Sequence, residues 1–362
     1  MNSNPHVTRT DPSDASDPSD LSDSSGATDT ARAAATMRAV VQHEYGSADT
    51  LQVAERTIPR PGAGDVLVRV IAAGVDSGTW HLMHGKPLLA RLAFGVRRPK
   101  NPVPGLDLAG VVVGVGARVT RFAVGDEVFG IGRGSFAEYS IASERKLAHR
   151  PEGLSATDAA AVPVSGLTAL QALRDAAQVG QGSRVLIIGA SGGVGSYAVQ
   201  IAVACGAEVT GVCGEAKAEF VRSLGAAEVI DRSQPQWWRT LIARGAPFDA
   251  VIDIAGRLPV RDLRRLTTRS GALVFVGGEG GGSITGGMGR QLRGVLRGLV
   301  SRQRISLLVS KVRGDDVEHL GQMIVAGSVT PRVDRVFPLA GAADALWAIE
   351  RGEVRGKLVV RI

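Results

Sequence analysis

The chain has 362 residues, a formal net charge of +7, 44% hydrophobic and 21% charged residues, and only two cysteines. This balance is typical of a folded protein and excludes a wholly disordered or fibrous chain. Two cysteines cannot build a disulfide framework, and no stretch approaches the roughly 18 apolar residues of a membrane span, so we predict a cytoplasmic protein with no membrane association.

The first 36 residues form an acidic segment with six aspartates, two arginines and almost no large apolar side chain. It carries a net charge of −4, which leaves +11 on the remaining residues. Such a segment buries too little apolar surface to offset the entropy of ordering, so we predict a disordered tail over residues 1–36. It has neither the apolar core of a secretory signal nor the arginine-rich composition of a transit peptide.

Residues 37–160 contain short β-branched runs separated by turn residues. Examples are 66–70, 110–116 and 126–130, with prolines and glycines between 59 and 64. This spacing predicts a mostly antiparallel β-domain.

From about residue 161, predicted helices and strands alternate. The helices are expected at 166–177, 194–205 and 217–224, and the strands at 184–188, 208–212, 248–253 and 271–276. This alternation predicts a parallel sheet with helices on both faces, and hence an α/β fold. A glycine-dense stretch (277–289) and a basic segment (290–304) follow, and then a strand (305–309), a helix (315–325), a short extended piece, a helix (342–350) and a strand (357–362).

The strongest motif lies between the predicted strand 184–188 and the helix that follows it. It reads Gly189-Ala190-Ser191-Gly192-Gly193-Val194-Gly195, a GxGxxG pattern in which Ala190 replaces the first glycine. The second glycine lets the backbone approach a pyrophosphate, the third allows close helix packing, and the helix N-terminus offers free N–H groups to the anion. The sequence therefore predicts a dinucleotide site.

The residue that selects between NAD and NADP is expected about 20 residues further on, where an acidic residue would bind the ribose hydroxyls of NAD. Gly214 stands there, and Lys217 and Arg232 follow as candidate partners of a 2′-phosphate. Glu215 lies next to that position and favours NAD instead. We predict NADP (NADPH) in preference to NAD, with solvated surface roles for Lys217 and Arg232 as the alternative.

The order of these parts resembles the medium-chain dehydrogenase/reductase superfamily, in its zinc-independent, quinone-oxidoreductase-like branch. The resemblance covers Met37 to Ile362 and is carried by the glycine motif together with 59–68, 104–110, 124–128, 134–139, 166–170 and 224–226. It implies a GroES-like catalytic domain formed by 37–160 and 311–362, a Rossmann domain formed by 161–310, and an active-site cleft between them.

Zinc-dependent relatives carry a Cys after the strand near Gly74, and a Gly-His-Glu ligand motif. This chain has no Cys there, and Leu106 stands in Gly105-Leu106-Asp107 where the His would be. The four-cysteine structural lobe is also missing from the sequence. His81 and His84 do not make a metal site without a third ligand, so we predict no metal.

Without a Lewis acid, the accessible chemistry is hydride transfer to a quinone or an enone, whose developing oxygen charge needs only a hydrogen-bond donor. Candidate catalytic residues are Tyr45, Asp76, Trp80 and His81, with His81 as proton donor or, alternatively, as a structural histidine. The resemblance adds further cofactor contacts at Thr168, Gly256, Val276, Gly277, Ser310 and Lys357.

Two alternatives remain open. One is an NAD(P)-dependent alcohol dehydrogenase without zinc, and the other is a non-catalytic protein that binds nucleotides or RNA through the arginines of 290–304. The absence of an RNP-like aromatic motif makes nucleic acid unlikely as a partner. The resemblance implies a homodimer formed through the Rossmann domains, near the segment after Gly277.

Overall fold

The computed structural model describes Met1 and residues 35–277 and 302–362. The predicted tail, apart from Met1, Ala35 and Thr36, therefore lies outside the described residues, as do the glycine-dense stretch after Gly277 and the basic segment up to residue 301. The first strand begins at Thr36, one residue before the expected start of order.

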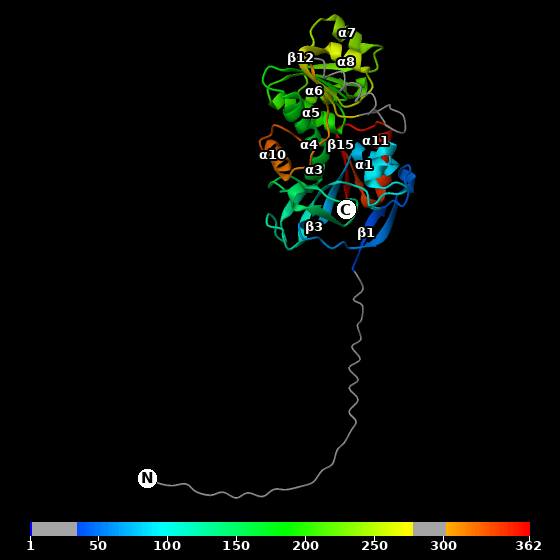
Figure 1. The fold of residues 1–362 in the computed structure, drawn as a ribbon, viewed down its shortest axis with the longest axis vertical. Helices are drawn as coiled ribbons and strands as arrows, with labels where there is room; N and C mark the ends of the chain where they lie inside the picture. Colours follow the sequence, from blue (N-terminus) through cyan, green and yellow to red (C-terminus); the bar gives the residue numbers. More distant parts are fainter. Residues whose placement is uncertain (2–34, 278–301) are drawn as a thin grey trace. The chain divides into compact units, whose positions relative to one another are not determined.

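The N-terminal part of the described chain is rich in strands (Figure 1). Its elements are β1 (Thr36–Val41), β2 (Gln52–Thr57), β3 (Asp65–Val75), α1 (Ser77–His84), α2 (Arg91–Phe94), β4 (Asp107–Val115), β5 (Glu127–Ile131), β6 (Tyr139–Ser143), β7 (Leu147–His149) and α3 (Ala156–Ala160).

The following part alternates between helix and strand. Its elements are α4 (Pro163–Gln171), a π-helical turn η4 (Ala172–Ala177), β8 (Arg184–Ile188), α5 (Gly193–Ala204), β9 (Glu208–Cys213), α6 (Ala218–Ser223), β10 (Glu228–Asp231), α7 (Trp237–Ala243), β11 (Phe248–Asp253), α8 (Val260–Leu266), β12 (Thr267–Phe275) and β13 (Arg304–Leu307). The last elements are α10 (Gly314–Val325), β14 (Val333–Pro338), α11 (Ala342–Glu350) and β15 (Lys357–Arg361).

The parallel sheet has the strand order β10-β9-β8-β11-β12-β13, and all neighbouring strands in it run parallel. In β8, Val185 and Ile187 pack into the cluster that includes α5, whereas Leu186 and Ile188 pack into the cluster formed with α7 and α8. Because successive side chains of a strand point to opposite faces, the sheet is covered on both faces. The predicted α/β class and Rossmann-like sheet are confirmed.

The second sheet has the order β14-β15-β3-β4-β5-β7, with β6 paired to β3. It is antiparallel as expected except that β14 and β15 run parallel, because α11 carries the chain back between them. The C-terminal strand β15 pairs with β3, so the end of the chain returns to the sheet of its N-terminal part, whereas β1 and β2 pair with each other as a separate two-stranded sheet. The exact domain boundaries stay a prediction.

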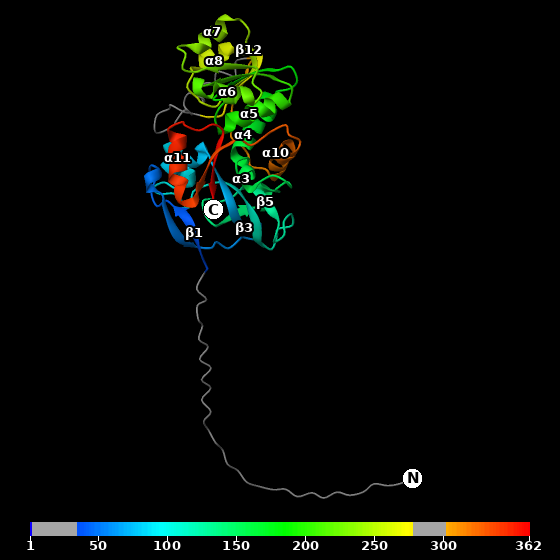
Figure 2. The same cartoon turned by 180° about the vertical axis from the view of Figure 1, so that it is seen from behind.

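Helices α3 and α4 lie between the two sheets (Figure 2). Helix α4 packs on α5 and also contacts β4 and β5. One hydrophobic cluster accordingly runs from Ala109 and Phe129, through Leu167, to Val185 and Ile187. In the described residues, no helix is both long and apolar enough to cross a membrane.

Candidate functional site

The glycine-rich loop joins β8 to α5 at the carboxyl edge of the parallel sheet. Gly192 is the N-cap of α5, and no side chain caps the helix, so its first-turn N–H groups can face an anion. A Cβ on Gly195 would lie 2.1 Å from the carbonyl oxygen of Gly189, so a glycine is required there. A Cβ on Gly192 would meet only that same oxygen, at 3.6 Å, which leaves room before the helix. This loop fits a pyrophosphate.

The other residues of the motif hold the loop in place. The backbone N–H groups of Gly189 and Ala190 both donate to the carbonyl oxygen of Val212, at 3.0 Å each, so the loop is tied to the end of β9. Ala190 is buried, and Val194 packs against the main core cluster.

Neighbouring strands bring further predicted residues to the same edge. The backbone N–H of Gly256 donates to Oδ1 of the buried Asp253 at 2.9 Å, and that of Val276 donates to the Asp253 carbonyl at 3.0 Å. Gly277 approaches Ile254 so closely that a Cβ would lie 2.1 Å from its carbonyl oxygen. The carboxyl edge of an open parallel sheet is where ligands bind in such folds.

The residues expected at the ribose end of the cofactor gather after β9. The exposed Arg232 lies beside Gly214, where a Cβ would be 3.8 Å from its Nε. Lys217, in contrast, donates through Nζ to the carbonyl oxygens of Gly352 and Val354, at 2.7 Å each. Burial, and then the charge of Arg232, lower the pKa of Lys217. Arg232 is therefore exposed, whereas Lys217 ties α6 to the C-terminal segment.

A third cation near this end was missed by sequence reasoning. The charge of Arg355 also lowers the pKa of Lys217, so its guanidinium lies in the same neighbourhood. Its backbone N–H is 3.5 Å from Oδ2 of Asp334. The only sequence signal for Arg355 was its position two residues before Lys357, in the C-terminal segment.

Lys357 is placed behind the glycine-rich loop. Its Nζ lies 3.2 Å from Oδ2 of Asp107 and 3.1 Å from Oγ of Ser165, and the side chain is 1% exposed. A Cβ on Gly193 would be 3.2 Å from its Cδ. The backbone N–H of the preceding residue, Gly356, donates to the carbonyl of Ser191 at 2.9 Å. Lys357 therefore supports the loop from within the protein.

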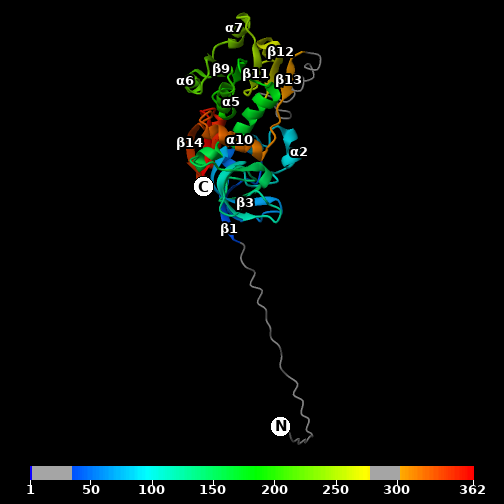
Figure 3. The same cartoon turned by 90° about the vertical axis from the view of Figure 1, so that its left-hand side faces the viewer.

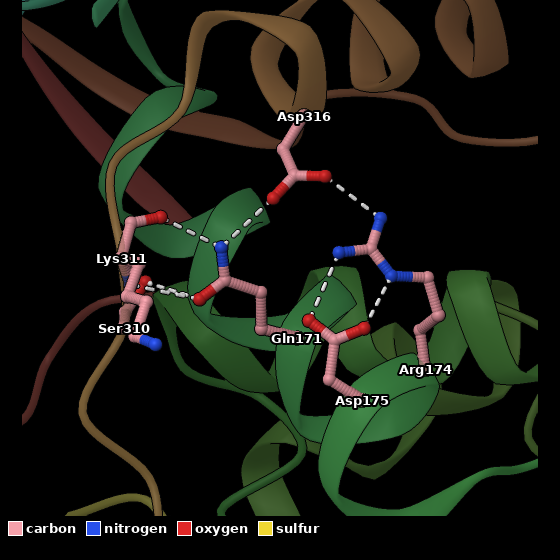
Figure 4. A network of polar contacts seen from close by, with 6 residues as sticks. All are labelled: Gln171, Arg174, Asp175, Ser310, Lys311 and Asp316. Atoms are coloured by element: carbon pink, nitrogen blue, oxygen red, sulfur yellow. Dashed lines mark hydrogen bonds and ion pairs between the residues drawn. The ribbon is translucent and has the colours of Figure 1, made fainter.

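Ser310 belongs to a polar network around the buried Gln171 (Figure 4). Its hydroxyl donates to Oε1 of Gln171 at 3.3 Å, and the backbone N–H of Lys311 donates to the same atom at 2.8 Å. The Gln171 amide donates in turn to the Lys311 carbonyl and to Oδ2 of Asp316, at 2.7 and 3.0 Å. Arg174 bridges Asp316 to Asp175. This network fixes the segment that leads from β13 to α10.

Thr168 lies on α4 and is half-buried. Its hydroxyl donates to the carbonyl of Val164 in its own helix, at 2.6 Å. The backbone N–H of Val164 donates to Oδ1 of Asp107 at 2.8 Å. The start of α4 is thus fixed to the same carboxylate that pairs with Lys357.

Three of the four candidate catalytic residues lie on α1 or at its start. Asp76 is buried and caps the helix, accepting from the backbone N–H of Thr79 at 2.8 Å. Trp80 donates through Nε1 to Glu350 at 3.1 Å, and its ring makes an edge contact with the ring of His81 at 4.9 Å. His81 is half-buried. Because its carboxylate serves as the helix cap, Asp76 is better suited to positioning α1 than to proton transfer.

Tyr45 lies at the opposite end of α1. A Cβ on the C-cap residue Gly85 would be 2.6 Å from the Tyr45 ring, and the Arg91 guanidinium stacks over that ring at 4.3 Å. Its hydroxyl donates to the Gly95 carbonyl at 2.6 Å. Burial raises the pKa of Tyr45, and Arg91 opposes that rise. Tyr45 therefore anchors the loop that follows α1.

Asp107 pairs with Lys357 behind the glycine-rich loop, and the charge of Asp76, at the start of α1, acts on the pKa of Asp107. Its pKa is raised to about 7, first by burial, while Lys357 lowers it and the nearby charge of Asp76 raises it. Within residues 35–277 and 302–362, no three His, Cys, Asp or Glu side chains are grouped as a metal ion requires.

Comparisons with known proteins agree with this arrangement. Residues 62–152 match the family model described as alcohol dehydrogenase GroES-like domain, and residues 224–360 match the model described as zinc-binding dehydrogenase.

Two curated relatives and one solved structure are similar along most of their length. The quinone-oxidoreductase QR1, chloroplastic, of Triphysaria versicolor is 34% identical over 328 residues, covering 87% of this chain and 95% of the relative. The NAD(P)H oxidoreductase RTN4IP1, mitochondrial, of Bos taurus is 28% identical over 356 residues, covering 90% of this chain and 89% of the relative. The quinone oxidoreductase structure from Coxiella burnetii superposes with a TM-score of 0.79 at 27% identity, covering 91% of this chain and 100% of the other.

The predicted resemblance is confirmed, and the non-catalytic alternative is set aside. The motifs, the two sheets and these relatives together show that the chain belongs to the medium-chain dehydrogenase/reductase superfamily, as a quinone-oxidoreductase-like, NAD(P)H-dependent oxidoreductase.

Proposed function

We propose that this enzyme uses NADPH, without zinc, to reduce quinones or α,β-unsaturated carbonyls. The observation that carries the choice of NADPH is the exposed Arg232 guanidinium beside Gly214, at the end of β9, where the ribose is expected. A cation there pairs with a 2′-phosphate, and glycine presents no carboxylate to repel it. The names of the relatives support the quinone substrate.

The residues divide the work between binding and proton supply. The N-terminus of α5 holds the pyrophosphate, and the loops at Gly256 and Gly277 form the neighbouring wall of the cofactor site. Thr168 and Ser310 are proposed to flank the nicotinamide end. The bound nicotinamide supplies a hydride, two electrons with one proton. A second proton completes the hydroquinone or the saturated carbonyl, and we assign its donation to His81.

The remaining candidates position this donor. Trp80 packs against the His81 ring, Asp76 caps α1, and Tyr45 holds the loop that follows it. The proposed arrangement keeps the division into 37–160 with 311–362 and 161–310, and it includes a homodimer, which light scattering of the purified enzyme would test.

The test is a comparison of substrates and cofactors. We expect oxidation of NADPH with 1,4-benzoquinone and with a simple enone, slower oxidation of NADH, and no turnover of unactivated aldehydes. Activity is expected to survive dialysis against a strong chelator. Turnover of simple alcohols or aldehydes without reduction of quinone or enone would instead support the alternative of a zinc-free alcohol dehydrogenase. Loss of activity in the chelator, restored by added zinc, would contradict the metal-free mechanism.

A further inference from the structure

A group of exposed apolar side chains lies between α1 and β4 and has no role in the proposed reaction. Leu92, Phe94 and Val96 are 72%, 50% and 64% exposed, and Leu88 and Leu89 beside them are also exposed. Large apolar side chains gathered on a surface commonly mark an interaction site. Figure 3 shows α2 at the periphery of the described body.

The same stretch is strongly basic. Residues 77–106 contain five Lys or Arg and no Asp or Glu. Of these five cations, Lys86, Arg97, Arg98 and Lys100 are exposed. Exposed apolar side chains beside unopposed cations are the combination by which proteins bind the surface of an anionic membrane.

The segment is held in a defined shape. The backbone N–H of Lys100 donates to the carbonyl of Phe94, and that of Gly95 donates to the carbonyl of Arg91, both at 2.8 Å. Arg91 Nε donates to the Gly85 carbonyl at 2.9 Å, and Lys100 Nζ donates to that of Ala93 at 2.9 Å. The apolar side chains are thus presented by a closed loop, and less entropy is lost when they insert into lipid.

We propose that residues 86–100 form a docking surface for membranes that contain anionic lipid. The exposed leucines, Phe94 and Val96 insert at the boundary between headgroups and acyl chains, and Arg97 and Arg98 contact lipid phosphates. This differs from the expectation of no membrane association, which rested on the lack of a crossing segment; an interfacial surface needs no such segment.

The position of the docking surface suggests a purpose for membrane binding, and this step rests on the proposed function. Helix α1 (Ser77–His84), which carries Trp80 and His81, ends two residues before the docking surface begins, and the Tyr45 hydroxyl donates to the carbonyl of Gly95 within that surface. An apolar quinone dissolved in the membrane would then meet the enzyme beside its candidate substrate residues.

The test uses the full chain and vesicles of two compositions, phosphatidylcholine alone and phosphatidylcholine with phosphatidylglycerol, in a sedimentation assay. We expect binding to the anionic vesicles that weakens with added salt. Arg97→Glu/Arg98→Glu is expected to weaken vesicle binding at least about tenfold, because each cation near such a surface contributes roughly a factor of five. Leu92→Glu/Phe94→Glu is also expected to weaken it at least about tenfold, because it removes two of the apolar side chains that insert. The matched controls, Val124→Glu/Val325→Glu and Arg118→Glu/Arg239→Glu, change equally exposed residues elsewhere and are expected to bind like the wild type.

Equal vesicle binding by the patch variants and the controls would overturn the proposal. The proposal would also be overturned if no form of the protein bound vesicles and the patch variants instead lost self-association, measured by light scattering. The same holds if no form bound vesicles and the patch variants instead lost the retention of an RNA. Reduction of water-soluble 1,4-benzoquinone is measured in parallel and is expected to be unchanged in every variant. Vesicle binding needs no turnover, so a protein that docks but does not reduce quinones would contradict the proposed function alone.

Discussion

The Nζ of Lys357 lies 3.2 Å from Oδ2 of Asp107, with the two side chains 1% and 0% exposed. The pair joins the first residue of β15 to the first residue of β4, and Ser165 connects it to α4. The aliphatic part of Lys357 lies directly beneath Gly193. One buried ion pair therefore supports the glycine-rich loop from the other sheet.

Breaking either half of this pair is expected to destabilise the protein by about 3–5 kcal/mol, because the remaining group must either keep a buried charge without its partner or change its protonation state. The two variants are Lys357→Met and Asp107→Asn, and the free energy of unfolding of each is measured by urea denaturation. Lys146→Met, at an exposed lysine, is the control, and we expect it to stay within about 0.5 kcal/mol of the wild type. A loss below about 1 kcal/mol in both pair variants would contradict the importance of the pair.

The two variants are expected to respond to pH in opposite ways. Burial raises the pKa of Asp107 from 3.8 to about 7, so its contribution to stability is fully present below the unfolded value and is lost as the pH rises through about 7. Asp107→Asn lacks that loss, so its deficit against the wild type should shrink between about pH 5 and 8. Lys357→Met removes the cation that lowers this pKa, so its deficit should grow above about pH 7. Deficits that move in the same direction would contradict this account.

Gly195→Ala is expected to impair the dinucleotide site. The new Cβ would lie 2.1 Å from the Gly189 carbonyl oxygen, so the helix must move away from the strand. We expect binding of NADPH, measured by fluorescence titration, to weaken more than about tenfold, with about 1–3 kcal/mol lost in stability. Gly180→Ala is the control, because a Cβ there meets nothing within 4 Å. Unchanged binding in Gly195→Ala would place the pyrophosphate elsewhere.

Arg232→Glu is expected to reverse the preference between cofactors. A charge-assisted contact with the 2′-phosphate contributes about 1.5–3 kcal/mol, so the KM for NADPH should rise about tenfold to a hundredfold while the KM for NADH changes little. Arg239→Glu, an exposed arginine on α7, controls for the overall change in charge. An equal rise for both cofactors would show that Arg232 does not read the phosphate.

Local pattern was sufficient for the elements that position the cofactor. The strands β8 and β11 lie where they were expected, because short apolar runs between glycine and charged residues indicate buried parallel strands. Gly192 and Gly195 could be singled out as candidates for the same reason, because a helix N-terminus, a tight turn and a close backbone approach all leave a local pattern in the sequence.

Contacts between distant parts of the chain left no such signature. Gln171 bonds to residues about 140 positions away, and Lys357 to one 250 positions away. The sequence of a helix shows that a glutamine is present, but not that its amide will be buried among carbonyls from another segment. The sequence likewise does not show that the leucines around Leu92 are exposed, because whether they are covered depends on tertiary packing.

Gln171→Leu is expected to loosen the segment that carries Ser310. It leaves the N–H of Lys311 and an oxygen of Asp316 without their bonds, which costs about 1–3 kcal/mol in stability. The KM for NADPH should rise more than the KM for quinone, and Ser310→Ala should reproduce a smaller part of that rise. If stability falls while both KM values stay unchanged, the network is structural only.

His81→Asn tests the assigned proton donor. A positioned general acid contributes about a hundredfold to ten-thousandfold in rate, so kcat for 1,4-benzoquinone should fall at least about a hundredfold while the Kd for NADPH is unchanged. His84→Asn is the matched control, because His84 lies on the same helix and stacks on Trp80 at 4.3 Å, and its loss should change kcat less than about threefold. Tyr45→Phe should likewise retain kcat, since the Tyr45 hydroxyl is bonded to the Gly95 carbonyl. A fall in kcat with Tyr45→Phe but not with His81→Asn would move the donor to Tyr45 and reduce His81 to a ring packed against Trp80.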